Sequence, residues 1–357
     1  MNLLDLAGSV WRANEQLIHS TLDLSGNVIN KMAELTGIHA KPHPVSPVIN
    51  NQGRWFSFKK IVIVGGIGAG IYLVYYLLKN RKQRVPYVEN FEPDVVYLFQ
   101  FPRPLSIPSL SPYALKLETW LRMSDINYLV VEDISLFHRS PEGTLPYVEL
   151  DGQVIVDSAN IIDVLTESRD TTDSHLKPDQ KAVVRALEVM IELSLNFCSA
   201  KYRYENFDEF FKIWSAPFLS LPVVRTLFKW FIVRVANKRI RASSMGKHSN
   251  ELAEKLGNRE LQALSDLLGS KHYLTGFKPT RADAAAFAAL TLILYVPFDN
   301  PQRRYINKHC QNLLDYAERI RTRFWPDWTL VTTLCKANTD WKRMIKPSNS
   351  RPASTAP

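Results

Sequence analysis

The order of strand and helix patterns between Asp94 and Ser168 limits the folds open to this chain more than any other feature. A buried-type strand, VVYLFQF, precedes a helix pattern, and a second apolar run, Tyr128 to Ile134, follows that helix. Two more strand patterns, LPYVEL and QVIVD, are joined by Asp151-Gly152, which suits a tight hairpin turn because glycine accepts positive φ. The pattern SANIIDVLTES then predicts a closing helix.

The sequence changes character after this region. From Pro178 onward no strand pattern recurs, and long helical patterns continue to residue 335. A βαβ unit followed by a ββα unit is the order of the thioredoxin-like fold. We therefore predict an α/β thioredoxin-like N-terminal domain over residues 94–168 and an all-α C-terminal domain over residues 178–335.

The first predicted helix begins within the stretch SLSPYALKLETWLRM. Ser111 stands where an N-cap hydroxyl can accept from free backbone N–H groups, and Pro112 follows at the first helical position, where its missing N–H costs nothing. Apolar side chains recur on one face of this helix, which leaves Lys116, Glu118 and Arg122 for solvent or for polar partners.

A second local signal predicts the start of a helix in the C-terminal domain. In KPTRADAAAFAALTLIL, Thr280 stands three residues before Asp283, which resembles a capping box with Asp in place of the usual Glu. We therefore interpret Asp283 as a folding residue and not as a catalytic one. A cap of this kind contributes about 0.5 to 2 kcal/mol to stability.

The run Ile61 to Leu78, IVIVGGIGAGIYLVYYLL, has no charged residue and is flanked by basic residues at both ends. A helix of this length is just able to cross the hydrocarbon layer of a membrane. A buried helix and the first turn of a dinucleotide-binding fold are the alternatives. The latter lacks its third glycine, because Ile71 stands there, and no apolar second strand follows. We predict one transmembrane helix at 61–78.

The residues on both sides of this run predict which way the chain is oriented in the membrane. Slightly more basic residues follow the span than precede it, and the three cysteines, Cys198, Cys310 and Cys335, are far apart, as expected of reduced thiols. We therefore expect the large C-terminal part to face the cytoplasm. Residues 1–50 combine an amphipathic helical pattern with a proline-rich linker, and residues 346–357 are typical of a disordered tail.

The formal charge of +9 does not by itself indicate a nucleic-acid partner. Lys and Arg are scattered along the chain without a DNA- or RNA-binding motif, so we expect no nucleic-acid binding. The cysteines lack a zinc spacing, and His39 and His43 lie among prolines that exclude a helix, so we predict no metal site.

The segment LFKWFIVRVANKRIRA raises the question of a helix on a membrane surface. A helical projection places its basic residues in two groups on nearly opposite sides, so no single basic face results. We predict a packed helix with its charged ends reaching solvent. The two groups are Arg225, Lys229 and Arg239, and Arg234, Lys238 and Arg241.

Four stretches together closely resemble the failed axon connections family, which is related to the metaxins and has the glutathione S-transferase fold. They are PSLSPYALKLETWLRM, GTLPYVELDGQVIVDSANIIDVL, LTGFKPTRADAAAF and YAERIRTRFWPDW. The resemblance covers roughly Asp94 to Trp328, and the run at 61–78 matches the layout of vertebrate members.

The resemblance implies a glutathione site. Ser111 in SPYA matches the position of the catalytic serine, cysteine or tyrosine, where a serine can cap the helix or donate to a bound thiolate. Pro146 matches the cis-proline whose backbone pairs with the cysteinyl part of glutathione, and Tyr147, which follows it, is included in the same expected site. Asp157 and Ser158 match the acidic-then-serine corner that holds the γ-glutamyl end. For each position a purely structural role stays open.

From this resemblance we expect a membrane-anchored protein that acts mainly through protein interaction, in axonal development or at an organelle membrane such as the mitochondrial outer membrane. The alternatives are a glutathione transferase with Ser111 as thiolate stabiliser, and a stress or metal response through glutathione binding. No cofactor is then required, glutathione is the candidate ligand, and a dimer is compatible with the family.

Overall fold

A computed structural model describes residues 86–132, 140–213, 222–243 and 247–334. The predicted span at 61–78, the N-terminal region 1–50 and the tail 346–357 lie outside these residues. Within the described ranges, no helix combines the length and the apolar character needed to cross a membrane.

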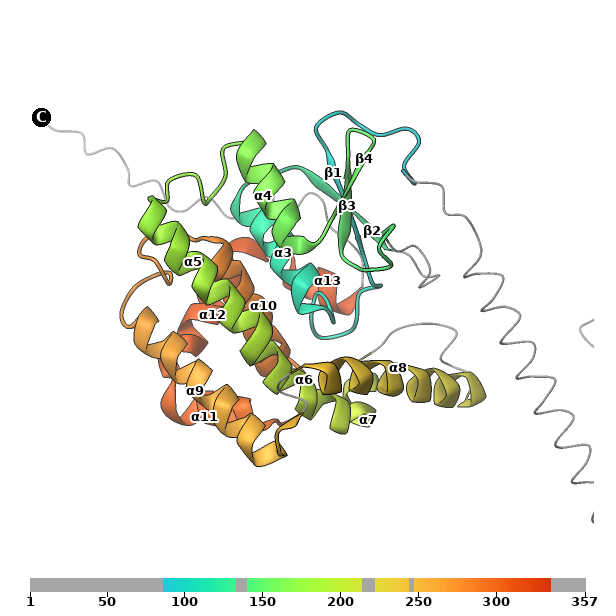
Figure 1. Ribbon diagram of the computed structural model, residues 1–357, viewed down its shortest axis with the longest axis vertical. Helices are drawn as coiled ribbons and strands as arrows, with labels where there is room; N and C mark the ends of the chain where they lie inside the picture. Colours follow the sequence, from blue (N-terminus) through green and yellow to red (C-terminus); the bar gives the residue numbers. More distant parts are fainter. Residues whose placement is uncertain (1–85, 133–139, 214–221, 244–246, 335–357) are drawn as a thin grey trace, which may run out of the picture. The chain divides into compact units, whose positions relative to one another are not determined.

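The N-terminal domain has the predicted order of strands and helices (Figure 1). Its sheet has the order β2-β1-β3-β4, in which β1 pairs parallel with β2 and antiparallel with β3, and β3 and β4 form the hairpin. The elements are β1 Val96–Gln100, α3 Pro112–Met123, β2 Tyr128–Glu132, β3 Tyr147–Leu150, β4 Gln153–Val156 and α4 Ser158–Ser168. The prediction of a thioredoxin-like arrangement is confirmed.

The two faces of this sheet have different partners because successive side chains of a strand point to opposite sides. Val96, Leu98 and Val148 pack with α3 and α4 in one apolar cluster. Tyr97, Phe99 and Tyr147 form a separate cluster on the other face. In Figure 1, α3 and α4 both lie on the side of the sheet that faces the helical domain.

The C-terminal domain is helical throughout its described residues, apart from loops and one isolated bridge between Tyr273 and Gly276. Its elements are α5 Pro178–Met190, the π-helical turn η1 Ile191–Leu195, α6 Asn196–Glu205, α7 Phe207–Phe211, α8 Pro222–Ala242, α9 Asn250–Leu268, α10 Arg281–Leu294, α11 Pro301–His309, α12 Gln311–Phe324 and α13 Trp328–Thr333.

Helix α10 joins the two domains. Its residues from Ala282 to Leu294 are all buried, and its run of alanines lets α3 approach closely, with Ala284 inside the apolar cluster of the sheet. The predicted capping box at its start is confirmed. The apolar core therefore extends from the sheet through α3 to α10, and the packing of α3 against α10 fixes the positions of both helices.

Candidate functional site

The strand register brings three of the predicted positions to one edge of the sheet. Phe99 near the end of β1 pairs with Tyr147 at the start of β3, and Tyr147 pairs with Val156 at the end of β4. Pro146 precedes β3 and Asp157 follows β4, so both lie at this edge. Helix α3 joins the parallel strands β1 and β2 and therefore begins at the same edge.

Ser111 is half-buried and caps α3, as the sequence predicts. Its Oγ accepts from the backbone N–H of Ala114 at 3.3 Å, and its carbonyl accepts from Leu115 at 3.0 Å. Its own N–H donates to the Oγ of Ser109 at 3.3 Å. A hydroxyl that accepts one bond keeps its proton, so Ser111 can still donate to a ligand. It cannot form a disulfide.

The peptide bond between Leu145 and Pro146 is cis, in agreement with the family pattern, and Pro146 is buried. The ring of Tyr147 does not lie with Ser111. It stacks on Phe99 at 4.4 Å between ring centroids, on the face of the sheet away from α3. Only the backbone of Tyr147 follows the edge of the candidate site, because strand alternation turns its side chain to the far face.

Asp157 and Ser158 begin α4. The Asp157 carboxylate is exposed, and its Oδ1 accepts from the N–H groups of Ala159 and Asn160 at 2.9 and 3.1 Å. Ser158 is the first helical residue and is 5% exposed. The carboxylate thus already occupies two of the helix N–H groups that a carboxylate ligand would use. Glutathione binding at this corner stays a prediction.

An ion cluster that the sequence patterns did not predict lies beside this corner. The ammonium of Lys116, which is 1% exposed, lies 2.8 Å from Oε1 of Glu188 and 2.6 Å from Oε1 of Glu192. Arg281, at the start of α10, contacts Glu188 at 3.4 Å and donates to the carbonyl of Ala159 in α4 at 3.1 Å. Of the two roles left open for Lys116, the polar partner is therefore observed.

The charges of this cluster act in opposite directions on its two carboxyl groups. Burial opposes ionisation of Glu188, but Lys116 and Arg281 outweigh it and lower the pKa of its carboxyl group. Burial raises the pKa of Glu192, although Lys116 opposes the rise. A spacing of 72 residues between Lys116 and Glu188 leaves no local sequence signal for this pairing.

A second buried network lies along α3 and includes the other two polar side chains of its predicted pattern. Glu118 lies 2.7 Å from Arg103, and Arg122 makes two bonds to Asp327, at 2.6 and 3.0 Å. Burial opposes ionisation of Glu118, but Arg103 and Arg122 outweigh it and lower its pKa. The carbonyl of Phe324 also accepts from Arg122, at 3.0 Å, so this network ties α3 to the end of the helical domain.

The proline-containing loop before Ser111 is anchored by the same network. Arg103 donates to the carbonyl of Pro108 at 3.0 Å from inside the loop. Ile107 is fully buried in an apolar cluster with α7, and the N–H of Leu105 donates to Ile213 at 2.8 Å. The loop is thus packed on the helical domain, and it fixes where α3 begins.

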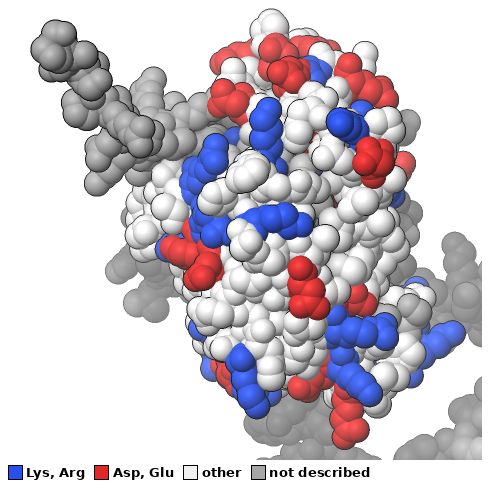
Figure 2. Space-filling view, turned by 90° about the vertical axis from the view of Figure 1, so that its left-hand side faces the viewer, with Lys and Arg blue, Asp and Glu red and all other residues white. Residues whose placement is uncertain are grey.

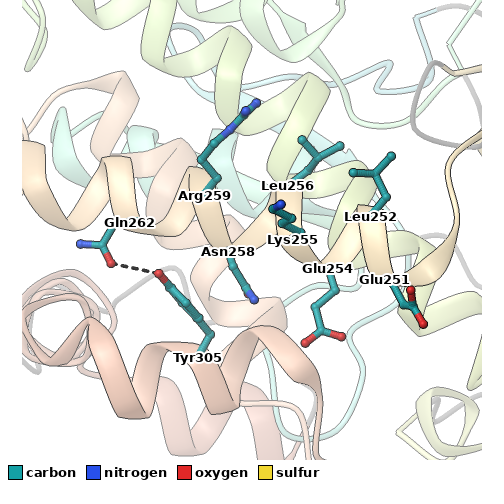
Figure 3. A pocket seen from close by; sticks show the side chains of 9 residues that line it. All are labelled: Glu251, Leu252, Glu254, Lys255, Leu256, Asn258, Arg259, Gln262 and Tyr305. Atoms are coloured by element: carbon teal, nitrogen blue, oxygen red, sulfur yellow. Dashed lines mark hydrogen bonds between the residues drawn. The ribbon is translucent and has the colours of Figure 1, made fainter.

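One surface hollow lies away from these residues. On the face that carries α5 and α9, Lys and Arg alternate with Asp and Glu (Figure 2). A hollow of about 810 Å³ is lined by α9 and Tyr305 of α11, whose hydroxyl donates to Gln262 at 3.0 Å (Figure 3). None of the predicted site residues lines it.

Within the described part of the chain, no group of three or more His, Cys, Asp or Glu side chains is arranged to hold a metal ion.

Comparison with known proteins identifies the family. Two family models match, described as the glutathione S-transferase N-terminal domain over residues 112–210 and the glutathione S-transferase C-terminal domain over residues 257–320. Failed axon connections of Drosophila melanogaster is 36% identical over 265 residues, which cover 70% of this chain. The chain belongs to the failed axon connections family. It spans 62% of the length of the fly protein.

Two further proteins with different names are also similar in sequence to this chain. Isoprene-epoxide–glutathione S-transferase of a Rhodococcus strain is 30% identical over 230 residues, which cover 61% of this chain and 94% of that enzyme. Human Metaxin-2 is 22% identical over 225 residues, which cover 60% of this chain and 82% of that protein. The chain is thus similar both to a protein named as a transferase and to proteins named as metaxins.

Proposed function

We propose that this protein is a membrane-anchored member of the failed axon connections family that acts mainly through protein interaction, with weak or absent glutathione transferase activity. The observation that carries the proposal is the proline-containing loop before Ser111, which is packed on the helical domain and fixes where α3 begins. Conjugation chemistry needs a group that stabilises a thiolate at this position, and a misplacement of about 1 Å is enough to lose useful turnover. The Ser111 hydroxyl that stands there caps α3 and keeps its proton.

The membrane anchor in this proposal is the uncharged run at 61–78, with the folded domains on the cytoplasmic side. The resemblance to the metaxins supports the mitochondrial outer membrane as one location, and the resemblance to Failed axon connections supports a role in axonal development. In both settings the folded domains would present their surface to protein partners or to a second copy of the chain.

A glutathione-binding transferase is the second candidate, and a specific observation favours it. The register places the start of α3, the cis-proline and the start of α4 at one edge of the sheet, where the N-terminus of α3 favours negative charge and Asp157 caps α4. The relative named as an isoprene-epoxide–glutathione S-transferase adds support. In this reading Ser111 donates to the bound thiolate, and a stress or metal response would act through glutathione.

The two candidates differ in the effect of Ser111→Ala on the full chain. Glutathione binding is measured by titration, and conjugation is measured with a general electrophile in parallel. We expect little turnover in the wild type and none that depends on Ser111. Ser249→Ala is the matched control, because Ser249 caps α9 through the N–H of Leu252 at 3.2 Å with no predicted ligand role. Turnover that collapses in Ser111→Ala alone, with glutathione affinity intact, would reject the interaction proposal.

The anchor is tested separately. We expect the full chain to stay with membranes during alkaline carbonate extraction, and a C-terminal tag to be digested by protease added to intact organelles. Extraction by carbonate would reject the span, and a fully protected tag would reject the orientation.

A further inference from the structure

Helix α8 is packed on one side only. Ala236 and Ile240 are 7% exposed, and Ile232 and Val233 pack against the apolar cluster of α7. In Figure 1, α8 extends beyond the other helices on the right of the view. Its opposite side carries Trp230, which is 63% exposed, although indole is a ring that proteins usually cover. This side of the helix has no partner among the described residues.

The exposed side gathers one of the two basic groups. Trp230, Arg234, Lys238 and Arg241 are spaced by four, four and three residues, so they lie on one face of the helix. All four side chains are exposed. We call these four residues the α8 face. Among the described residues no carboxylate forms an ion pair with its three cations, and Arg234 lies over the Trp230 ring at 5.5 Å.

Two members of the opposite group are already engaged by the protein. Lys229 forms an ion pair with Asp208, and Arg225 lies 5.3 Å from the ring of Phe211. Arg225 and Lys229, from the group on the opposite side, thus have partners inside the fold, whereas the three cations of the α8 face have no ion-pair partner among the described residues.

The charged residues of α8 itself have a single sign. The sequence contains no Asp or Glu from residue 210 to residue 250, and α8 lies within this interval. The face that carries α5 and α9 is different, because acidic and basic side chains alternate there (Figure 2). An occupant of the α8 face must therefore be anionic, and it must also accept an exposed indole ring.

We propose that the α8 face binds the anionic headgroups of the membrane in which the chain is anchored. This inference rests on the proposed span. If the span ends at Leu78, seven residues separate it from Pro86, and the eight steps between these two residues reach at most about 28 Å. The folded domains must then lie close to the bilayer.

The composition of the face fits a lipid surface. Tryptophan is enriched at the boundary between headgroups and acyl chains, where its ring is buried and its N–H stays hydrated. Lys and Arg are attracted to the negative surface of a cytoplasmic leaflet, and the contributions of three such residues to binding add up. Because the chain is already tethered, a weak contact suffices to orient the domains.

The experiment uses the full chain reconstituted into vesicles of phosphatidylcholine with or without phosphatidylserine, with brominated phosphatidylcholine as the quencher. The Trp230 signal is the emission that Trp230→Phe removes. We expect this signal to be quenched in vesicles that contain phosphatidylserine, and the quenching to be lost in Arg234→Gln/Lys238→Gln/Arg241→Gln, since three cations change surface binding by about 100-fold. Lys255→Gln/Arg259→Gln/Lys278→Gln removes three exposed cations from other sites and should keep the quenching.

Several outcomes would overturn the proposal. They are a Trp230 signal that brominated lipid does not quench, quenching that is equal with and without phosphatidylserine, and loss of quenching in the control variant. Displacement of the face from lipid by an acidic polypeptide at physiological salt would favour a protein partner instead. Carbonate extraction is measured in parallel. If the chain stays with the membrane but Trp230 is not quenched, the α8 proposal alone is rejected. If carbonate extracts the chain but Trp230 is quenched, the span alone is rejected.

Discussion

Two helix starts, that of α3 at Ser111 and that of α10 at Thr280, have the same local design and different surroundings. Each has a hydroxyl residue at the N-cap position, and each helix packs against the other. At α10, Asp283 is fully buried and accepts four bonds at 2.8 Å, from the N–H and Oγ1 of Thr280, the N–H of Leu274 and the hydroxyl of Tyr316. At α3, Ser111 accepts one bond and is half-buried.

The difference separates a structural cap from a cap that can also serve a ligand. Each acceptor site of Asp283 is used inside the fold, so no position remains for an external group. Ser111 keeps its hydroxyl proton and lies at the sheet edge with Pro146 and Asp157. A hydroxyl residue at the N-cap is therefore part of a buried capping box in one domain and a candidate binding group in the other.

The largest expected effect is that of Asp283→Ala. Loss of a cap alone costs about 0.5 to 2 kcal/mol. Here the N–H of Leu274 and the hydroxyl of Tyr316 also lose a buried acceptor, so we expect a loss of about 2 to 4 kcal/mol of unfolding free energy. Chemical denaturation of the full chain measures it. An unchanged unfolding transition would show that the hydrogen bonds of Asp283 do not stabilise the fold, and the two helix starts would then not differ in this respect.

Asp283 should also give the folded state a dependence on pH that Ser111 lacks. Burial raises the pKa of its carboxyl group above the ordinary value of 3.8. The folded state therefore holds the proton more tightly than the unfolded state. The contribution of this group is complete below the unfolded pKa and is lost as pH rises through the folded pKa.

The measurement compares melting temperatures of the wild type and Asp283→Asn, which does not titrate at this position. The difference in favour of the wild type should decrease as pH rises from about 4 toward neutrality. A difference that is constant over this interval would contradict a raised pKa, and one that increases would indicate a lowered pKa.

The smallest expected effect is that of Ser111→Ala. Removal of one half-buried cap should lower the unfolding free energy by about 0.5 to 1 kcal/mol. Ser249→Ala should lower it by a similar amount, because the Ser249 cap has the same geometry. If Ser111→Ala is as costly as Asp283→Ala, its hydroxyl is part of the core and the two helix starts are equivalent.

Local sequence signals were sufficient for the elements and their order. The strand patterns, the hairpin at Asp151-Gly152, the Ser111 cap and the box formed by Thr280 and Asp283 each depend on residues a few positions apart. The physical terms that favour them, such as backbone conformation and cap hydrogen bonds, act over the same short distance. For the same reason a resemblance in short motifs was enough to indicate the family.

Tertiary structure decided what the polar residues do. Lys116 meets Glu188 across 72 residues, and Arg122 meets Asp327 across 205 residues, so no local pattern distinguishes these side chains from exposed ones. Tyr147 belongs to the predicted glutathione site because it follows Pro146, and strand alternation places its ring on the far face of the sheet. The basic residues of α8 were predicted on two sides, and only packing determined that Lys229 pairs with Asp208 and Arg225 lies over Phe211. Helix and strand formation are decided by neighbours in the chain, whereas exposure and ion pairing depend on neighbours in space.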